Sequence, residues 1–305
     1  MKDKILVTGA NGNLGKKFML SKGEVDVCAL VRSEKAKNDL MNFVQAHDIQ
    51  DIQIVKCDYL DEQVIKELAR SCTYVLHLVG IIKENKDNRF DVVHKQTTKA
   101  LVAAIKGSDI KKCCYISILG AKEGSENTCF SSRGLAEKLF LDSDIPSLVL
   151  QVPMVLGEGD YACEALKKNA LSRFNFTFRK LSLEQPIYAG DIIDAIKLDI
   201  SRTLKGDYSP SGIKALAGPT SLTRERLIIR VAKQLGVKVK VCSIPLFLGY
   251  AFARIFEILF SHPPITTAML GVLDHDDDID PLPSCNELGI KLTTLDSMLE
   301  TTISP

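Results

Sequence analysis

Short apolar runs alternate with amphipathic stretches through the first half of the chain. The apolar runs predict buried strands at Lys4–Thr8, Val25–Val31, Asp51–Cys57, Tyr74–Val79, Lys112–Ile118 and Ser147–Val152. Between them, apolar residues recur at helical spacing and predict helices at Asn13–Ser21, Glu34–His47, Glu62–Ala69, Phe90–Lys106 and Arg133–Asp142. Strands that alternate with helices in this way form a parallel sheet with helices on both faces. The pattern therefore predicts an α/β fold with a doubly wound parallel sheet.

The alternation stops after residue 153, where glycine and proline recur at short intervals. Asp191 is placed to cap a helix at Ile192–Ile200, and Thr223 to cap one at Arg224–Leu235. These segments predict an elaborating lobe rather than an independent domain. We expect one domain to comprise residues 1–153 and about 186–206, and a smaller C-terminal lobe to comprise about 154–185 and 207–305.

The most apolar segment of the chain is Ile244–Phe260. It contains Arg254 and Glu257 and is too short to cross a membrane as a helix. Because apolar residues lie nearly all round it, three alternatives stay open. The segment is buried in the lobe, docks a protein partner, or rests on a membrane surface.

Composition narrows the classes of partner. Among 305 residues, 39 are lysine or arginine and 38 are aspartate or glutamate, so no basic surplus points to nucleic acid. The nine cysteines are scattered without a CxxC pair, and the amino terminus enters a strand directly. Both features predict free thiols and a cytoplasmic protein, peripheral to a membrane if residues 244–260 rest on one. The acidic run 274–280 lacks the glycine and terminal glutamate of a calcium loop, so no metal site is expected.

A glycine-rich turn joins the first predicted strand to the first helix. It reads Thr8-Gly9-Ala10-Asn11-Gly12-Asn13-Leu14-Gly15. The first glycine of such a motif permits a tight turn, the second lets the backbone approach a pyrophosphate, and the third lets the helix pack on the sheet. The N-terminus of the helix then presents free N–H groups to the phosphates. This unit predicts a Rossmann domain that binds a dinucleotide.

The end of the second strand bears on which dinucleotide binds. An NAD-selective site places an acid there to accept from the ribose 2′-hydroxyl. This chain has Arg32, followed by Glu34 and Lys35. A guanidinium suits a 2′-phosphate, so NADP is the expected cofactor and NAD the alternative.

These residues resemble the short-chain dehydrogenase/reductase superfamily, in its atypical or extended group with the motif TGxxGxxG, which includes NAD-dependent epimerases and dehydratases. Further matches lie beyond the glycines. Cys57-Asp58 resembles the adenine-contacting aspartate segment, Leu78-Val79-Gly80 the segment beneath the adenine ribose, and Tyr115-Ile116-Ser117 the strand with the active-site serine. Phe90, His94, Thr97 and Leu101 resemble the helix after the fourth strand. The run from Gln151 to Asp160, which contains Val152-Pro153, resembles the segment that borders the nicotinamide.

Later segments extend the resemblance over nearly the whole chain. Gln185–Ile192, Ala217–Thr223 and Leu288-Gly289-Ile290 resemble the branch that includes the Rossmann-type accessory subunit of respiratory complex I and its bacterial relatives. The resemblance implies a site lined by the residues matched above. The expected cofactor-binding residues are Gly9, Asn11, Gly12, Asn13, Leu14, Gly15, Arg32, Asp58, Leu78, Val79, Gly80, Ser117, Arg133, Val152 and Pro153.

The resemblance also identifies a departure from the family's catalytic pattern. Its reductases use a tyrosine and a lysine at Y-x-x-x-K, in which the tyrosine transfers the proton. With Glu137 fixing the register, this chain has Cys129 and Arg133 at those positions. Cys129 is a candidate acid or an inert packing residue, and Arg133 can donate to ribose hydroxyls. The candidate catalytic residues are Ser117, Cys129 and Arg133.

Three functions remain open at this stage. The first is an NADP(H)-binding protein whose cofactor is structural or senses redox state. The second is an active oxidoreductase, epimerase or dehydratase with a non-standard acid and a small-molecule substrate. The third is a co-regulator or assembly factor, as in NmrA-type regulators, which also lack the usual pair. The sequence leaves the reaction, and whether the protein is an enzyme, undecided.

Overall fold

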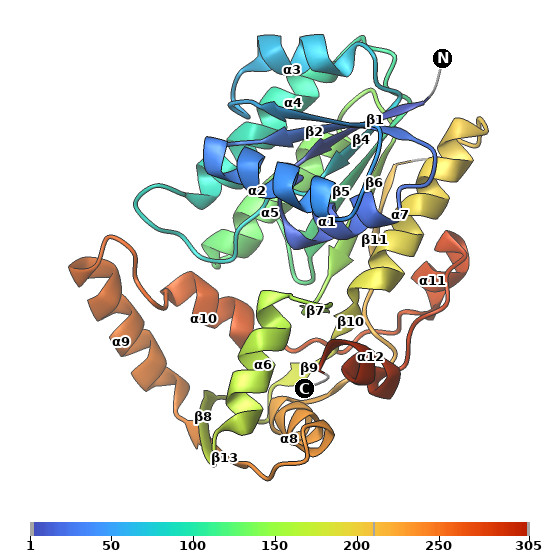
Figure 1. Cartoon of the computed structure of the whole chain (residues 1–305). Coiled ribbons are helices and arrows are strands. Elements are labelled where there is room, and N and C mark those ends of the chain that lie inside the picture. Colours follow the sequence, from blue (N-terminus) through green and yellow to red (C-terminus); the bar gives the residue numbers. More distant parts are fainter. Residues whose placement is uncertain (1–2, 210, 304–305) are drawn as a thin grey trace.

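The computed structural model describes residues 3–209 and 211–303, and its centre is a seven-stranded sheet (Figure 1). The order across the sheet is β11-β6-β5-β4-β1-β2-β3, and every neighbouring pair is parallel. The strands are β1 (Lys4–Thr8), β2 (Asp26–Val31), β3 (Ile52–Lys56), β4 (Tyr74–His77), β5 (Lys112–Ile118), β6 (Ser147–Val152) and β11 (Gly212–Ala215). This arrangement confirms the predicted α/β fold and doubly wound sheet, because the order reverses at β1 and β4.

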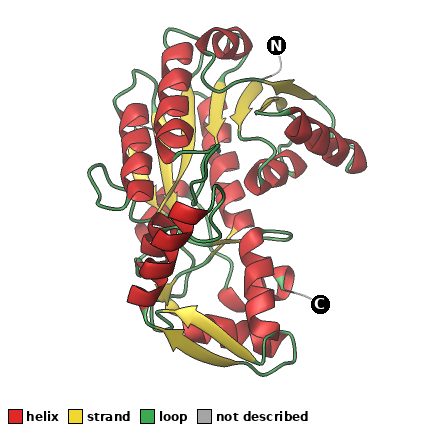
Figure 2. Cartoon of the chain, turned by 90° about the vertical axis from the view of Figure 1, so that its left-hand side faces the viewer, coloured by secondary structure: helices red, strands yellow, loops and turns green. Residues whose placement is uncertain are grey.

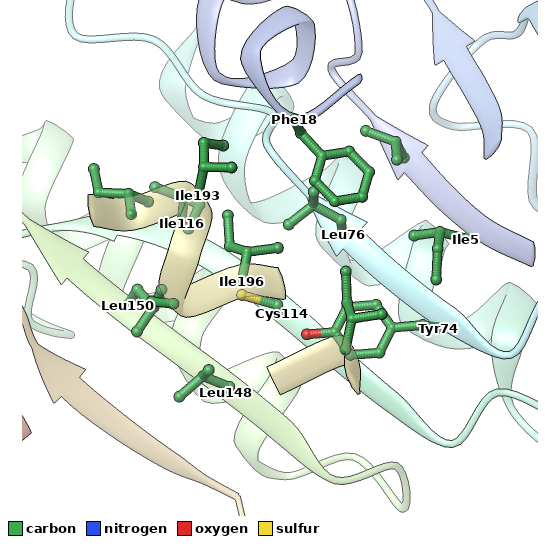
Figure 3. Packing of buried hydrophobic residues seen from close by; sticks show 14 of the residues in the cluster. Ile5, Phe18, Tyr74, Leu76, Cys114, Ile116, Leu148, Leu150, Ile193 and Ile196 are labelled. Carbon is green, nitrogen blue, oxygen red and sulfur yellow. The ribbon is translucent and has the colours of Figure 1, made fainter. Parts of the chain in front are cut away.

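Helices cover both faces of this sheet. One face is covered by α1 (Asn13–Leu20), α2 (Glu34–Ala46), α7 (Ala189–Leu204) and α11 (Leu282–Leu288). Figure 3 shows the apolar core beneath them, where Phe18 and Ile196 pack against strand residues such as Leu76. The other face is covered by α3 (Glu62–Ala69), the π-helical turn η1 (Asp91–Gln96), α4 (Thr97–Ile105) and α5 (Thr128–Leu141). Burial of apolar surface on both faces explains why the strands are apolar almost throughout.

The lobe is built from small sheets and helices below the main sheet (Figures 1 and 2). Its strand pairs are β7 (Val155–Leu156) with β10 (Ile187–Tyr188), β8 (Phe174–Phe178) with β13 (Lys240–Ile244), and β9 (Leu183–Glu184) with β12 (Leu222–Thr223). Its helices are α6 (Tyr161–Leu171), α8 (Arg224–Gln234), α9 (Leu246–Leu259), α10 (Thr267–Asp274) and α12 (Leu295–Thr302). A separate core of α6, α8 and α12 side chains holds the lobe together.

Several boundaries differ from those predicted. Helix α5 begins at Thr128 rather than Arg133, because the Asn127 side chain accepts from the backbone N–H groups of Cys129 and Phe130. The helix expected at Phe90–Lys106 begins with a π-helical turn. Strand β11 lies in the segment assigned to the lobe, yet it pairs with β6 of the main sheet.

The two predicted caps in the lobe had different outcomes. The Thr223 hydroxyl accepts from the Arg226 N–H and caps α8, as predicted. The Asp191 prediction was wrong, because α7 begins at Ala189 and the Asp191 carboxylate instead accepts from the Thr293 N–H and hydroxyl.

For the apolar segment that forms helix α9, the sequence left three alternatives open, and the first of them, burial within the lobe, is wrong. Only its small residues Gly249 and Ala253 are buried, and Gly249 lies against the Phe178 ring. Most of its large side chains are exposed, with Phe247 at 70% and Ile258 at 83% exposure. Figure 1 shows α9 at the periphery of the molecule. Across the described ranges, no helix is both long and apolar enough to span a membrane.

A buried ion pair fastens the edge of the sheet at which the parallel strands begin. Lys112, the first residue of β5, donates to Asp199 of α7 at 2.7 Å and to the Ser209 hydroxyl at 2.6 Å. The Tyr74 hydroxyl donates to the second carboxylate oxygen of Asp199 at 2.6 Å. The pair is therefore compensated by hydrogen bonds on both sides, and it lies at the opposite edge from the residues predicted to bind a cofactor.

Candidate functional site

The predicted cofactor-binding residues gather at the carboxyl edge of the main sheet. Each group follows the end of a strand: Gly9 follows β1, Arg32 follows β2, Asp58 follows β3, and Leu78 follows β4. Ser117 is the last residue but one of β5, Val152 ends β6, and Pro153 follows it. Because all these strands run parallel, their ends meet at one edge, where ligands of open α/β sheets bind.

The glycine-rich turn has the geometry of a phosphate-binding loop. Gly9 has a φ of +71°, and a Cβ added there would lie 2.9 Å from the carbonyl carbon of Leu78. A Cβ on Gly15 would lie 2.3 Å from the Ala10 carbonyl oxygen. Glycine is therefore required at position 9 for its backbone conformation and for close approach to the segment after β4. At position 15 it is required for close approach of α1 to the loop.

This loop fits a dinucleotide on observations of the structure itself. Gly12 occupies the N-cap of α1 without a capping side chain, and the first bond of the helix runs from the Lys16 N–H to the Gly12 oxygen. The N–H groups ahead of it have no partner within a helix and suit an anion. The buried side-chain oxygen of Asn11 has no hydrogen-bond partner among the described residues. Asn13 and Leu14 form the first turn of α1, so this predicted set is brought together.

The loop is held from behind by a residue that sequence reasoning missed. The Tyr59 hydroxyl accepts from the Gly9 N–H at 2.9 Å and donates to the Leu30 oxygen at 2.7 Å. Burial raises the pKa of Tyr59 to about 12, so the phenol stays protonated. Asp58, immediately before it, is exposed and accepts from the Leu60 N–H.

Arg32 is exposed at the end of β2, where a ribose 2′-substituent would be read. Its guanidinium donates to the Asn88 side-chain oxygen. Glu34, the acid closest to it in sequence, pairs with Lys56 at 2.7 Å, and this pairing lowers the pKa of Glu34. The acid is thus engaged elsewhere, whereas Arg32 and Lys35 leave this end of β2 positively charged.

Ser117, one of the candidate catalytic residues, is fully buried on β5. Its hydroxyl has no hydrogen-bond partner among the described residues. The Gln151 amide donates to Glu137 at 2.9 Å, which partly opposes the burial that raises the pKa of this carboxyl. Gln151 also donates to the Ala121 oxygen at 3.2 Å. Gln151 thus ties the end of β6 to α5 and to the loop after β5, beside the predicted nicotinamide segment at Val152 and Pro153.

Cys129, in the first turn of α5, is fully buried. Burial raises the pKa of the Cys129 thiol to about 11, and the nearby Arg133 charge only partly offsets this. The thiol points to the Ile81 carbonyl oxygen at 3.8 Å. A buried thiol that is a weaker acid than tyrosine is expected of a packing residue rather than a proton donor.

Arg133 turns inward beneath the end of β4. Its guanidinium donates to the Ile116 oxygen at 2.9 Å and to the Tyr115 hydroxyl at 3.3 Å. A Cβ on Gly80 would lie 2.1 Å from Nη2, so the missing side chain at Gly80 makes room for the guanidinium. Its buried Nε lacks a hydrogen-bond partner within the described chain. Tyr115, which is fully buried, is thus a tyrosine in contact with Arg133, although the two residues are 18 positions apart in the sequence.

Two buried histidines complete the interior beside Arg133. The His77 ring lies 2.7 Å from the Thr8 hydroxyl, and the His94 ring accepts from the Ile81 N–H and bonds the Ser132 hydroxyl. Burial and the Arg133 charge lower the pKa of His77 to about 3 and of His94 to about 2. Both rings are therefore neutral at physiological pH and act in hydrogen bonding rather than proton transfer.

The lobe's acidic run is occupied by internal contacts. Arg179 pairs with Asp274 and Asp276, and Asp276 also accepts from the Ser182 hydroxyl at 2.9 Å. His275 bonds Asp277 at 3.0 Å. The described residues contain no group of His, Cys, Asp and Glu side chains that could hold a metal ion.

Comparisons with known proteins agree with this geometry. Residues 1–151 match the family model described as the NmrA-like family. Subunit 9 of the mitochondrial NADH dehydrogenase [ubiquinone] 1 alpha subcomplex is 22% identical in Mus musculus, over 95% of this chain and 77% of that protein. The Arabidopsis thaliana counterpart is 24% identical, over 72% of this chain and 55% of that protein.

A solved structure shares the whole fold. UDP-glucuronic acid 4-epimerase from Bacillus cereus, in complex with UDP-glucuronic acid and NAD, has a TM-score of 0.71 at 18% identity, with 98% of each chain covered. These findings confirm the resemblance expected from the sequence: the chain has an NmrA-like N-terminal part at residues 1–151, shares its fold with a solved nucleotide-sugar epimerase, and is similar over most of its length to subunit 9 of the NADH dehydrogenase 1 alpha subcomplex.

Proposed function

We propose that the protein binds NADP(H), in preference to NAD(H), as a structural or redox-sensing cofactor. The observation that carries the proposal is the combination of a complete glycine loop with a buried Cys129. The loop leaves the first N–H groups of α1 for an anion, while the thiol at the family's tyrosine position has a raised pKa. In this proposal Arg133 provides a fixed positive charge near the ribose, and the bound nicotinamide supplies the redox-active ring.

The preference for the phosphorylated dinucleotide is supported by charge at the end of β2. Arg32 and Lys35 are exposed there, and Glu34 is paired with Lys56. A planar guanidinium can hold a 2′-phosphate through two parallel hydrogen bonds, which an acid at this place would oppose.

The proposal is tested on the purified protein. We expect mass spectrometry to identify a co-purified NADP(H), and we expect no turnover against panels of carbonyl compounds and nucleotide sugars. Robust turnover that Cys129→Ala abolishes would contradict the non-catalytic role and favour an active oxidoreductase or epimerase. Cys72→Ala is the matched control, because Cys72 is also a buried thiol with a raised pKa but lies before β4, away from the site.

We further propose that the outward face of α9 docks a protein partner. Phe247, Phe252 and Ile258 are each more than half exposed, which is uncommon for side chains of this size on one helix. The mouse and Arabidopsis relatives are named as subunits of an assembly, and this favours a protein partner over a membrane surface.

A photo-crosslinking amino acid at position 258 tests this docking surface in cells, with position 41 on α2 as the exposed apolar control. We expect a defined protein adduct at position 258 and none at position 41. Crosslinking to lipid at position 258 would contradict the protein partner and favour a peripheral membrane location.

A further inference from the structure

The Tyr59 side chain joins three segments that are separate in the sequence. Tyr59 lies between β3 and α3, directly after Asp58. Its hydroxyl accepts from the Gly9 N–H at 2.9 Å and donates to the Leu30 oxygen at 2.7 Å. Leu30 lies on β2, two positions before Arg32. One phenol therefore contacts the glycine loop and the strand that precedes Arg32, from the loop that contains Asp58.

These contacts leave the glycine loop little freedom to move. Gly9 is held in front by the backbone of Leu78 and Val79, since an added Cβ would lie 2.9–3.0 Å from their atoms. On the other side, the Tyr59 hydroxyl accepts from the Gly9 N–H, and Tyr59 as a residue is only 7% exposed. Phenylalanine at position 59 would leave the Gly9 N–H without this acceptor, and it would leave the Leu30 oxygen with the longer 3.3 Å bond from Ala10.

We propose that Tyr59 is a positioning residue of the dinucleotide site. Its hydroxyl sets the spacing between the glycine loop, Arg32 and Asp58, which would receive the pyrophosphate, the 2′-phosphate and the adenosine of one ligand. A ligand that spans all three segments gains from their fixed spacing because less ordering is needed on binding. A fragment that reaches fewer segments gains less. This inference rests on the proposed binding of NADP(H).

The test compares two Tyr→Phe variants by calorimetric titration with NADPH and with adenosine 2′-monophosphate. Tyr74→Phe is the matched control, because Tyr74 is also a buried tyrosine with a bonded hydroxyl, but at the opposite edge of the sheet. We expect Tyr59→Phe to weaken NADPH binding about tenfold, which corresponds to about 1.4 kcal/mol, and adenosine 2′-monophosphate binding less than threefold. Tyr74→Phe should lower the Tm and leave both affinities unchanged.

Three results would overturn the inference while leaving the proposed function intact. In the first, Tyr59→Phe binds NADPH within about threefold of the wild type. In the second, it loses affinity equally for NADPH and the fragment. In the third, Tyr74→Phe weakens NADPH binding as much as Tyr59→Phe does. Absence of NADPH binding by the wild-type protein would overturn both.

A measurement on the wild-type protein covers the case in which Tyr59→Phe does not fold. Hydrogen exchange of the Gly9 amide should be slow in the ligand-free protein, because this N–H is bonded to a buried phenol. Exchange as fast as in an exposed loop, such as that around Gly124, would show that the phenol does not hold the glycine loop.

Discussion

Substituting Gly15 by alanine tests whether the close approach of α1 to its loop is required. An added Cβ would lie 2.3 Å from the Ala10 oxygen, 2.8 Å from its carbonyl carbon and 2.9 Å from its Cα. All three atoms belong to the backbone, so α1 must move away from the loop by about 1 Å to restore ordinary contact. In an unobstructed helix the same change would stabilise by about 1 kcal/mol. Overpacking costs about 1–3 kcal/mol and exceeds that gain where backbone must shift.

We therefore expect Gly15→Ala to lower the free energy of unfolding by up to about 2 kcal/mol. It should also weaken NADPH binding at least tenfold, since the displaced N–H groups of α1 are those that face the phosphates. Urea denaturation and calorimetric titration measure the two effects. Gly212→Ala on β11 is the control, because its Cβ would meet no atom within 4 Å. A Gly15→Ala protein as stable as the wild type, with unchanged NADPH affinity, would refute the reasoning.

Three further predictions follow from buried groups. Lys112→Met should lower the free energy of unfolding by about 3–5 kcal/mol, because it leaves Asp199 buried without its cation. Chemical denaturation measures this loss. The NADPH affinity should be unchanged, because the ion pair lies at the opposite edge of the sheet. Burial raises the pKa of Asp160 from 3.8 to about 6, so its contribution to stability is complete below about pH 4 and is lost as the pH rises through 6. Relative to the wild type, Asp160→Asn should therefore gain roughly 1–3 kcal/mol of stability as the pH rises from 4 to 7, whereas a constant difference in unfolding free energy over that range would contradict the raised pKa. Because burial raises the pKa of the Cys129 thiol to about 11, iodoacetamide should leave it unmodified in the folded protein at neutral pH and modify it after unfolding. Peptide mapping measures this modification. Rapid alkylation of Cys129 in the folded protein would instead show a reactive thiol.

The features that the sequence predicted correctly are those set by local chemistry. The glycine loop needs a turn, a close approach and a helix start, and each requirement is met by a residue within one short motif. The strands are apolar because both faces of the sheet are covered, and the Thr223 cap acts on its own helix. Their signals lie within a few residues of the structure that they form.

The features that the sequence missed depend on distant contacts. Asp191 was available as a cap, but Thr293, far along the chain, takes its carboxylate. Tyr59 follows a predicted adenine-contacting aspartate, yet nothing in its neighbourhood indicates that its hydroxyl reaches Gly9 and Leu30. The sequence left the role of Cys129 open between an acid and a packing residue, because the protonation of its thiol depends on burial by the surrounding fold, which outweighs the arginine one helical turn away. Helix α9 has the composition of a core helix, but only Gly249 and Ala253 of it are buried.

The most direct test of the central claim is titration of the wild-type protein and Arg32→Ala with NADPH and NADH. We predict that the wild type binds NADPH at least tenfold more tightly than NADH, a difference of about 1.4 kcal/mol that a charged hydrogen bond to a 2′-phosphate can supply. Arg32→Ala should remove most of this preference and leave NADH binding nearly unchanged. Equal affinities of the wild type for the two dinucleotides would contradict the role assigned to Arg32, and binding of neither would contradict the account of the glycine loop itself.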